Sequence, residues 1–250
     1  MQGFGICHLS VVPMREEASD KSEMTSQILY GELLTVLNKT EKWCRVKLEE
    51  DGYEGWISTH QFTPISKEDF ITYQGKTKQY NCDLVEYVWN SDKILLPISL
   101  GASIHNASLL NHSFDGNFSD PIFRKENLLL TAQSYLNAPY LWGGKTPFGI
   151  DCSGFVQMVY RMNNIALPRD ASDQSLEGEV LSFIEETEPG DLAFFDNAEG
   201  QIIHVGIVMP DNYIIHAHGQ VRIDRLDQSG IYNVDTNQHS HQLRLLKKMA

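Results

Sequence analysis

Length, composition and charge narrow the classes of protein to which this 250-residue chain can belong. Its 33 acidic and 20 basic residues give a net charge of −13, which argues against nucleic acid as a partner because phosphate binding requires basic patches. Apolar residues make up 42% of the chain and charged residues 21%, as in ordinary globular proteins, and no apolar run is long enough to span a bilayer. The composition therefore predicts a globular protein that binds neither nucleic acid nor membrane.

The cysteines and the N-terminus indicate the compartment. Cys7, Cys44, Cys82 and Cys152 are widely scattered and form no C-x-x-C pair, so neither a structural zinc site nor a disulfide framework is indicated. Residues 1–8 lack a basic segment followed by an apolar one, which a secretory signal requires. We therefore expect a cytoplasmic protein, or a periplasmic or secreted one if an export signal has been removed from the chain.

Residues 7–64 contain short apolar runs separated by turn signals. The runs lie at residues 9–15, 33–37, 43–48 and 53–57. Asp51-Gly52, between the last two runs, is a strong hairpin signal. Short strands at this spacing predict a small β-barrel of about 60 residues.

Residues 65–118 continue the β-like pattern less clearly. Strand candidates lie at 71–73, 84–89 and 93–98, so we predict a second, degenerate β unit of the same kind. Residues 106–121 are polar and rich in glycine and asparagine, which predicts a linker.

From Phe123 onward the pattern changes. Residues 126–136 predict a helix that ends at Asn137-Ala138-Pro139. Strands are predicted later, at residues 192–195, 202–209 and 213–217. Helices grouped first and antiparallel strands grouped afterwards predict an α+β domain.

Cys152 is the first candidate catalytic residue. Apolar side chains at 155, 156, 159, 160 and 162 recur at helical spacing, so Cys152 is expected at or just inside a helix N-terminus with Asp151 or Ser153 as its cap. Unpaired amides and the helix dipole stabilise a thiolate in that position. The alternative is a small buried cysteine on a core helix.

A thiol nucleophile needs a base and a group that orients the base. His204 and His216 lie in apolar strand-like runs joined by the turn Pro210-Asp211-Asn212, and a hairpin centred on this turn places both on one face. His218 shares that face, and periodicity alone does not choose between His216 and His218 as the orienting group. Histidines in polar, loop-like surroundings are weaker candidates for the catalytic base, among them His105, His112, His239 and His241.

Five strings in the C-terminal half carry a family resemblance. They are Tyr140-x-Trp142-Gly143-Gly144, Asp151-Cys152-Ser153-Gly154-Phe155-Val156, Leu167-Pro168-Arg169-Asp170, Pro189-Gly190-Asp191-Leu192 and His204-Val205-Gly206-Ile207 followed by Ile215-His216-Ala217. In these strings and their order the chain resembles the NlpC/P60 cysteine peptidases. The resemblance implies a papain-like fold in which Cys152 is the nucleophile, His204 the base and His216 the orienting residue. It requires no metal or cofactor.

The N-terminal region carries a second resemblance. The strings P-x-R, G-E-x-L-x-V-L and W-x-x-V-x-L, followed by D-G-Y-E-G-W-I, are similar to bacterial SH3-like (SH3b) domains. The expected architecture is an SH3-like barrel at residues 1–64, a second degenerate unit and linker at 65–118, and an NlpC/P60 peptidase domain at 119–250. The alternative for residues 1–64 is a plain β-barrel that acts only as a spacer.

The resemblance also implies a substrate. Peptidases of this domain arrangement cut the γ-D-glutamyl–L-diamino acid bond of murein peptides that have a free N-terminal L-Ala, which fits recycling of such peptides in the cytoplasm. A cationic amine in a closed pocket needs a carboxylate, and Asp151 matches a family residue in that role. Tyr140 and Ser153 are expected to contact substrate near the nucleophile, with Glu54 and Tyr87 contributing from the barrel side.

Two other functions remain open from the sequence. One is a secreted endopeptidase that acts on intact peptidoglycan. The other is a non-catalytic wall-binding protein, against which the intact set of Cys152, His204 and His216 argues. The sequence does not distinguish lysine from meso-diaminopimelate as the diamino acid.

Overall fold

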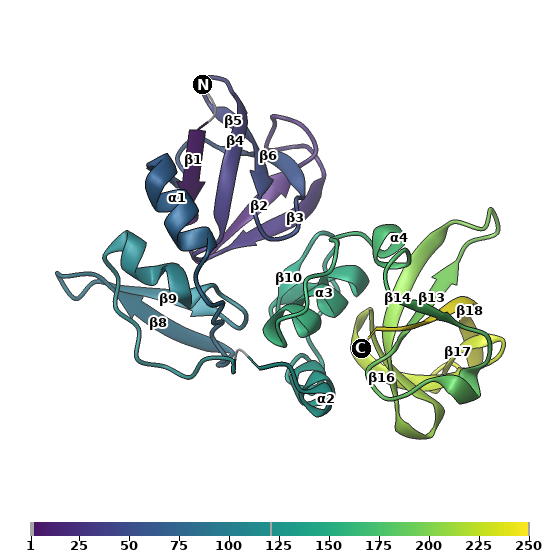
Figure 1. Cartoon of the computed structure of the whole chain (residues 1–250). Coiled ribbons are helices and arrows are strands. Elements are labelled where there is room, and N and C mark those ends of the chain that lie inside the picture. Colours follow the sequence, from purple (N-terminus) through teal and green to yellow (C-terminus); the bar gives the residue numbers. More distant parts are fainter. Residues whose placement is uncertain (1–2, 121, 250) are drawn as a thin grey trace. The chain divides into compact units, whose positions relative to one another are not determined.

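The computed structural model describes residues 3–120 and 122–249 and divides into two units (Figure 1). The first unit contains Met1–Ile122 together with Trp142–Pro147, and the second contains Phe123–Leu141 and Phe148–Ala250. Met1, Gln2 and Pro121, which fall within the N-terminal and linker predictions, lie outside the described residues.

The first unit begins with an antiparallel SH3-like β-barrel. Its strands are β1 (Gly3–Ile6), β2 (Val11–Arg15), β3 (Met24–Leu29), β4 (Leu33–Lys39), β5 (Trp43–Leu48), β6 (Glu54–Ser58) and β7 (Thr63–Ile65), in the sheet order β3-β2-β6-β5-β4-β1-β7. Alternate side chains of β5 point inward, so Cys44, Val46 and Leu48 join a buried core that includes Met14 and Ile28. The predicted barrel is confirmed.

The turn at Asp51-Gly52 joins β5 and β6 as predicted. Gly52 has φ of +73°, a left-handed conformation that glycine adopts without a steric cost, and Lys47 pairs with Glu54 across the hairpin. Asp51 accepts a hydrogen bond from the Tyr53 backbone N–H at 2.9 Å.

Residues 71–73, predicted as a strand, belong instead to helix α1 (Lys67–Gln74). Ser66 caps this helix by accepting a hydrogen bond from the Asp69 N–H at 3.0 Å. Phe70 is buried against Phe4, with ring centroids 4.5 Å apart. The cap and this one buried aromatic side chain outweigh the β-branched residues that suggested a strand.

The rest of the first unit contains β8 (Val85–Trp89) and β9 (Leu95–Ser99), which pair as an antiparallel hairpin, then 3-10 helix η1 (Ile104–Leu110) and β10 (Lys145–Thr146). Part of the predicted linker is therefore ordered and packed. Asn106 is 3% exposed and donates a hydrogen bond to the Gly31 carbonyl at 2.9 Å, while Ala107 packs in a core cluster with Tyr30 and Val88. The polar side chain of Asn106 in this segment thus serves to hydrogen-bond the backbone of another segment.

The second unit is built on an antiparallel sheet of seven strands. These are β12 (Glu179–Leu181), β13 (Leu192–Asp196), β14 (Ile202–Met209), β15 (Tyr213–His218), β16 (Gln220–Asp227), β17 (Gly230–Asn233) and β18 (Gln238–Lys248), in the order β12-β18-β13-β14-β15-β16-β17. An additional pairing joins β17 to β18. Figure 1 shows these strands in green to yellow.

The helices of the second unit precede most of its strands. They are α2 (Lys125–Gln133), α3 (Cys152–Met162) and α4 (Ala171–Gln174), with short elements β11 (Gly149–Ile150), η2 (Ile184–Glu186) and η3 (Pro210–Asn212). Helix α3 packs against α2 and against β14 and β15, and all its residues are buried. The predicted α+β class is confirmed, and α3 is buried along its whole length.

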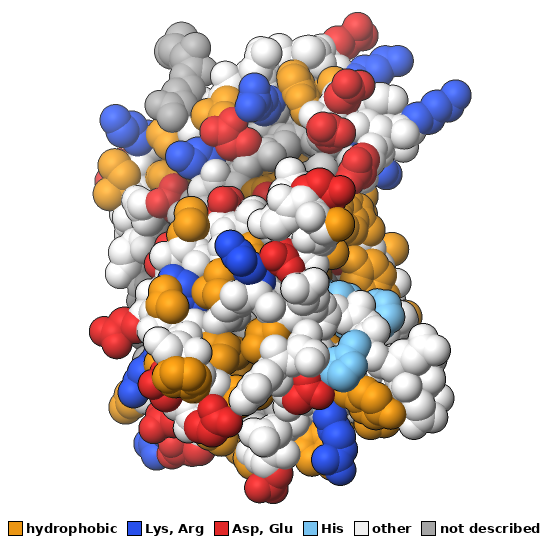
Figure 2. Space-filling view, turned by 90° about the vertical axis from the view of Figure 1, so that its right-hand side faces the viewer, with side chains coloured by type: hydrophobic (Ala, Val, Ile, Leu, Met, Phe, Trp, Pro, Cys, Tyr) orange, Lys and Arg blue, Asp and Glu red, His pale blue; other side chains and the backbone are white. Residues whose placement is uncertain are grey.

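Among the described residues, no helix has the length and apolar character needed to cross a membrane. Figure 2 shows acidic and basic side chains interspersed over the face in view, with histidine side chains reaching the surface there.

Candidate active site

Cys152 is the first residue of α3, as the sequence predicts. Asp151 is the N-cap, with extended backbone angles, and its carboxylate accepts a hydrogen bond from the Gly154 N–H at 2.7 Å. Ser153 is not the cap; its hydroxyl lies 3.3 Å from Asp151 Oδ1 and is equally buried. The cap fixes the point at which the helix begins, and therefore the position of the Cys152 side chain.

Arg169 also binds the Asp151 carboxylate. Its two terminal nitrogens lie 3.0 and 2.6 Å from the two Asp151 oxygens, and one of them is also 2.9 Å from Ser153 Oγ. Both charged side chains are almost fully buried. This bidentate pair is the strongest kind of charge-assisted contact that a carboxylate makes in proteins.

The environment of Cys152 favours the thiol over the thiolate. Burial, together with the negative charge of Asp151, raises the pKa of Cys152 to about 12, although hydrogen bonds with the backbone of Val205 and Ser153 and the charge of Arg169 oppose the shift. The sequence-based expectation of a helix-stabilised thiolate differs from this result, because burial outweighs the helix end. Deprotonation therefore depends on a nearby base.

His204 and His216 lie on one face of the β14–β15 hairpin, as predicted. Gly206 pairs directly with His216, so His204, two residues earlier on β14, is the diagonal neighbour of His216. His204 Nε2 lies 2.8 Å from His216 Nδ1, and both side chains are buried. Val205, whose backbone bonds to Cys152, follows His204 directly and brings the thiol to this strand.

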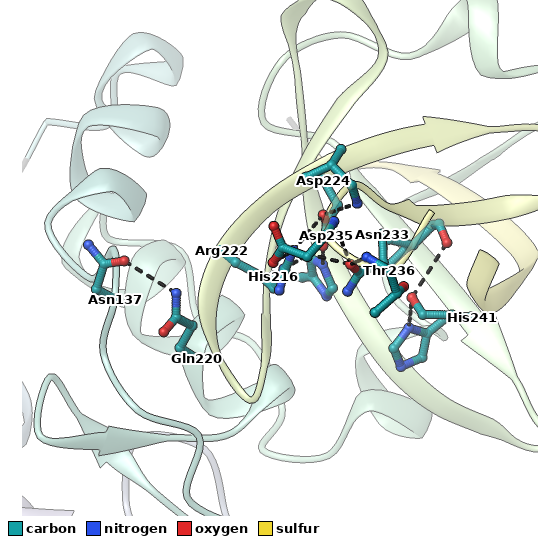
Figure 3. Close-up of polar contacts among 12 residues, drawn as sticks. Asn137, His216, Gln220, Arg222, Asp224, Asn233, Asp235, Thr236 and His241 are labelled. Carbon is teal, nitrogen blue, oxygen red and sulfur yellow. Dashed lines mark hydrogen bonds and ion pairs between the residues drawn. The ribbon is translucent and has the colours of Figure 1, made fainter. Parts of the chain in front are cut away.

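The polar chain continues to a third strand. His216 Nε2 lies 3.1 Å from Oδ2 of Asp224, which stands on β16 and is fully buried (Figure 3). Arg222 binds the same carboxylate at 2.6 and 3.0 Å. Of the two histidines that periodicity left open, His216 makes the hydrogen bond to His204, while His218 is exposed and its ring centroid is 6.5 Å from that of His204.

His241 is closer to the site than its polar sequence context indicated. It stands on β18, and its ring stacks on His204 with centroids 4.1 Å apart and planes 19° apart. Burial, then the nearby rings of His216, His241 and His218, lower the pKa of His204 well below its ordinary value. His204 is therefore a neutral imidazole near pH 7 and is able to accept the Cys152 proton.

Tyr140 belongs to the second unit near this cysteine. Burial raises the pKa of Tyr140 to about 12, with the charges of Cys152 and Asp151 adding to the shift and Arg169 opposing it. The next residues of the same motif group with the first unit, where Trp142 Nε1 donates to Glu23 at 2.5 Å.

Glu54 and Tyr87 lie in the first unit, on β6 and β8. Glu54 forms an exposed ion pair with Arg45 at 3.0 Å, and Tyr87 is 43% exposed. Their roles in substrate binding remain predictions.

Sequence reasoning did not assign roles to Arg169 or Asp224. Arg169 stands inside the string Leu167-Pro168-Arg169-Asp170, so a search for a partner of buried Asp151 could have found it. Asp224 shares the parity of His216 in the next hairpin, which turns at Gly219, so strand periodicity carried that signal. Among the residues that the structure describes, no group of three or more His, Cys, Asp or Glu side chains could hold a metal ion.

Comparisons with known proteins agree on the family. Residues 137–239 match the NlpC/P60 family and residues 14–62 match the bacterial dipeptidyl-peptidase Sh3 domain. The γ-D-glutamyl-L-lysine dipeptidyl-peptidase of Bacillus cereus is 26% identical over 231 residues, covering 80% of this chain and 68% of that protein. The probable endopeptidase NlpC of Escherichia coli is 36% identical over 134 residues, covering 53% of this chain and 84% of that protein.

A solved structure shares the fold. The crystal structure of an NlpC/P60 family protein from Bacillus cereus superposes with a TM-score of 0.78 at 19% identity, covering 98% of this chain and 99% of that one. An antiparallel sheet beside a buried helix that starts at a cysteine defines the papain-like class of cysteine peptidases. This chain belongs to the NlpC/P60 family, with an SH3-like domain at its N-terminal end.

Gly206 provides the space in which the two histidine rings meet. A Cβ atom at this position would lie 2.9 Å from the Cβ of His216 and 2.7 Å from Ile214, and His216 Cβ cannot retreat unless β15 moves. We expect Gly206→Ala to lower peptidase kcat/KM by at least about 10-fold, because sub-ångström to 1 Å displacement of catalytic groups costs that much or more. Steady-state kinetics of the purified variant measure the effect.

Gly200→Ala is the matched control for this variant. Gly200 has φ of +77°, and no atom lies within 4 Å of the position that an alanine Cβ would take. Alanine there strains the backbone but leaves the histidines in place. Equal kcat/KM values for the two variants would show that the close approach at Gly206 is unimportant for activity.

Proposed function

We propose that the chain hydrolyses the γ-D-glutamyl–L-diamino acid bond of murein peptides whose N-terminal L-Ala is free, as in recycling of cell-wall fragments. The observation that carries the proposal is the buried contact between His204 and His216 beside the start of the helix that bears Cys152. The name of the Bacillus cereus relative, a γ-D-glutamyl-L-lysine dipeptidyl-peptidase, supports the choice of bond.

The first half-reaction forms a thioester. His204 takes the Cys152 proton, and the sulfur attacks the carbonyl carbon of the γ-D-glutamyl group. Backbone N–H groups at the start of α3 stabilise the negative charge that develops on the carbonyl oxygen. Protonated His204 then donates its proton to the leaving amine of the diamino acid, and the carbon–nitrogen bond breaks.

The second half-reaction restores the enzyme. His204, neutral again, removes a proton from water, and the hydroxide attacks the thioester carbonyl carbon. The carbon–sulfur bond breaks, Cys152 recovers its proton from His204, and L-Ala-γ-D-Glu leaves. His216 keeps the His204 ring oriented through both steps because it holds Nε2 at 2.8 Å.

In this proposal the free amine of L-Ala is bound close to the nucleophile. Asp151 supplies a carboxylate, with Ser153 and Tyr140 beside it, and Glu54 and Tyr87 are the proposed contribution of the first unit. Arg169 already neutralises much of the Asp151 charge, so a second carboxylate would strengthen binding of an ammonium group.

A panel of synthetic peptides tests this proposal. We expect L-Ala-γ-D-Glu-L-Lys or its meso-diaminopimelate counterpart to be cut at the γ-glutamyl bond, with L-Ala-γ-D-Glu detected by mass spectrometry. N-acetylation of the same peptide removes the charged amine, and the loss of charge-assisted hydrogen bonds worth about 1.5–3 kcal/mol should lower kcat/KM by about 10- to 100-fold.

The panel also separates this proposal from the alternative enzyme. Equal rates on free and N-acetylated peptides, together with release of fragments from intact peptidoglycan, would favour a wall endopeptidase. The name of the Escherichia coli relative, a probable endopeptidase, supports that second candidate. Absence of cleavage of every peptide in the panel would refute both.

A further inference from the structure

Asp224 is a buried carboxylate surrounded only by hydrogen-bond donors. Oδ2 receives Arg222 Nε at 2.6 Å and lies 3.1 Å from His216 Nε2. Oδ1 receives Arg222 Nη2 at 3.0 Å and the backbone N–H of Val234 at 3.1 Å. These four contacts, two to each oxygen, match the number of hydrogen bonds that an ionised carboxylate can accept, and Figure 3 shows Asp224 beside His216 and Arg222.

The donors keep Asp224 ionised. Burial alone would raise the pKa of Asp224, but the hydrogen bonds from His216, Arg222 and Val234 outweigh burial and lower that pKa far below its ordinary value. Arginine and a backbone N–H can only donate, and an ionised carboxylate can only accept. His216 must therefore present a protonated Nε2 to Asp224.

The protonated Nε2 determines the rest of the chain of imidazoles. Burial lowers the pKa of His216, so near pH 7 its ring is neutral and carries one proton, at Nε2. His216 Nδ1 is then an acceptor, and His204 Nε2, 2.8 Å away, must donate to it. Neutral His204 is left with an unprotonated Nδ1, the one ring nitrogen free to accept a proton from Cys152.

The sheet fixes this order across three strands. His216 pairs with Gly206 on one side and with Arg222 on the other, so His204 and Asp224 both stand two residues away from the residue opposite His216. All three polar side chains therefore project from the same face along one diagonal. Arg222 also binds Asp235 at 2.7 Å, which fixes the arginine that holds Asp224.

We propose that Asp224 is a positioning residue for the reaction proposed above: its carboxylate holds His216 in the Nε2–H tautomer, which leaves Nδ1 of His204 unprotonated and available to take the Cys152 proton. Asp224 acts through two imidazoles and does not touch the substrate. This role adds a fourth member to the set formed by Cys152, His204 and His216.

Asp224→Asn is the most informative substitution because the amide replaces one acceptor oxygen with a donor of nearly equal size. Each oxygen position faces two donors, and only the imidazole of His216 can become an acceptor by changing tautomer. The amide NH₂ group therefore turns toward His216, which moves its proton to Nδ1 and reverses the donor and acceptor order of His204. A protonated Nδ1 on His204 cannot act as the base.

We expect Asp224→Asn to lower kcat by about 10- to 100-fold with KM changed less than 3-fold, since a tautomer reversal affects the chemical step rather than binding. The imidazole ¹⁵N shifts of His216 should move from protonated Nε2 to protonated Nδ1. The rate at which iodoacetamide modifies Cys152, measured by mass spectrometry of the peptide that contains it, should fall together with kcat.

Asp227→Asn is the matched control. Asp227 stands on the same strand and pairs with exposed His239 at 2.9 Å, while it caps the turn through Ser229 and Gly230. Asparagine keeps those turn contacts, so kcat, the His216 shifts and the alkylation rate should equal those of the wild type.

The measurements distinguish this inference from the proposed function. If the wild type cuts no peptide, the proposed function fails, whereas the ¹⁵N shifts and alkylation rates still test the role of Asp224. A wild-type His216 protonated at Nδ1 overturns the inference even if Asp224→Asn fails to fold. The inference is also overturned if Asp224→Asn and Asp227→Asn have the same kcat and the same His216 tautomer.

Discussion

Replacing Cys152 with alanine is expected to lower peptide hydrolysis by at least about 10⁴-fold, because the covalent thioester cannot form without the sulfur. Cys152 stands at the start of buried α3 beside the strand of His204, and no other cysteine belongs to the second unit. Release of L-Ala-γ-D-Glu from the free tripeptide, followed by mass spectrometry over hours, measures the residual rate.

Cys82→Ala is the control for general effects of removing a thiol. Cys82 is exposed and lies in the first unit, so its loss should leave kcat/KM unchanged. A Cys152→Ala variant that retains more than about 1% of the wild-type rate would exclude the thiol mechanism, since loss of a nucleophile leaves far less. A purely wall-binding protein would instead show equal, negligible turnover in all three proteins.

The raised pKa of Cys152 explains why the nucleophile depends on its base. A thiol whose pKa is raised in this way is almost entirely protonated at pH 7. His204, whose pKa is lowered well below 6.5, remains neutral at that pH and able to accept a proton. The resting site is thus a neutral thiol beside a neutral imidazole, and the thiolate forms as the substrate is attacked.

Local patterns in the sequence were sufficient for the parts of the site that neighbouring residues determine. The cap of α3 follows from Asp151 preceding an apolar helical run, and the shared face of His204 and His216 follows from strand parity about one turn. His241 could not be placed in the same way. It reaches His204 only because β18 inserts next to β13, a pairing between segments far apart in the sequence.

The fold was predictable to a similar degree. The hairpin at Asp51-Gly52 and the alternation in β5 identified the barrel, because both signals are local. Helix α1 and the ordered segment around Asn106 were predicted wrongly. One depends on Phe70 packing against the barrel, the other on a side-chain bond to Gly31, and neither contact is visible in local periodicity.

Substituting methionine for Arg169 should destabilise the second unit by about 3–5 kcal/mol, because the buried carboxylate of Asp151 loses its bidentate partner. Methionine retains the apolar length of the side chain, so lost packing contributes little. The remaining hydrogen bonds from Ser153 and Gly154 do not supply a positive charge. Since Asp151 caps the helix that begins at Cys152, peptidase activity should fall as well.

The distribution of tryptophan separates the two units in this experiment. All four tryptophans, Trp43, Trp56, Trp89 and Trp142, belong to the first unit, so their fluorescence reports its unfolding. Amide hydrogen exchange of peptides from β13 to β15 reports the second unit. Arg169→Met should leave the urea midpoint of tryptophan fluorescence unchanged while exchange in the second unit accelerates.

Arg244→Met provides the matched control, because Arg244 is 61% exposed in its side chain and its pair with Asp196 is long, at 3.6 Å. An exposed pair of this kind contributes at most about 1 kcal/mol. The double variant Arg169→Met/Asp151→Asn should recover part of the lost stability, since it removes the buried charge that Arg169→Met alone deprives of its bidentate partner. If Arg169→Met and Arg244→Met were equally mild, the buried pair would be holding neither the helix start nor the nucleophile in place.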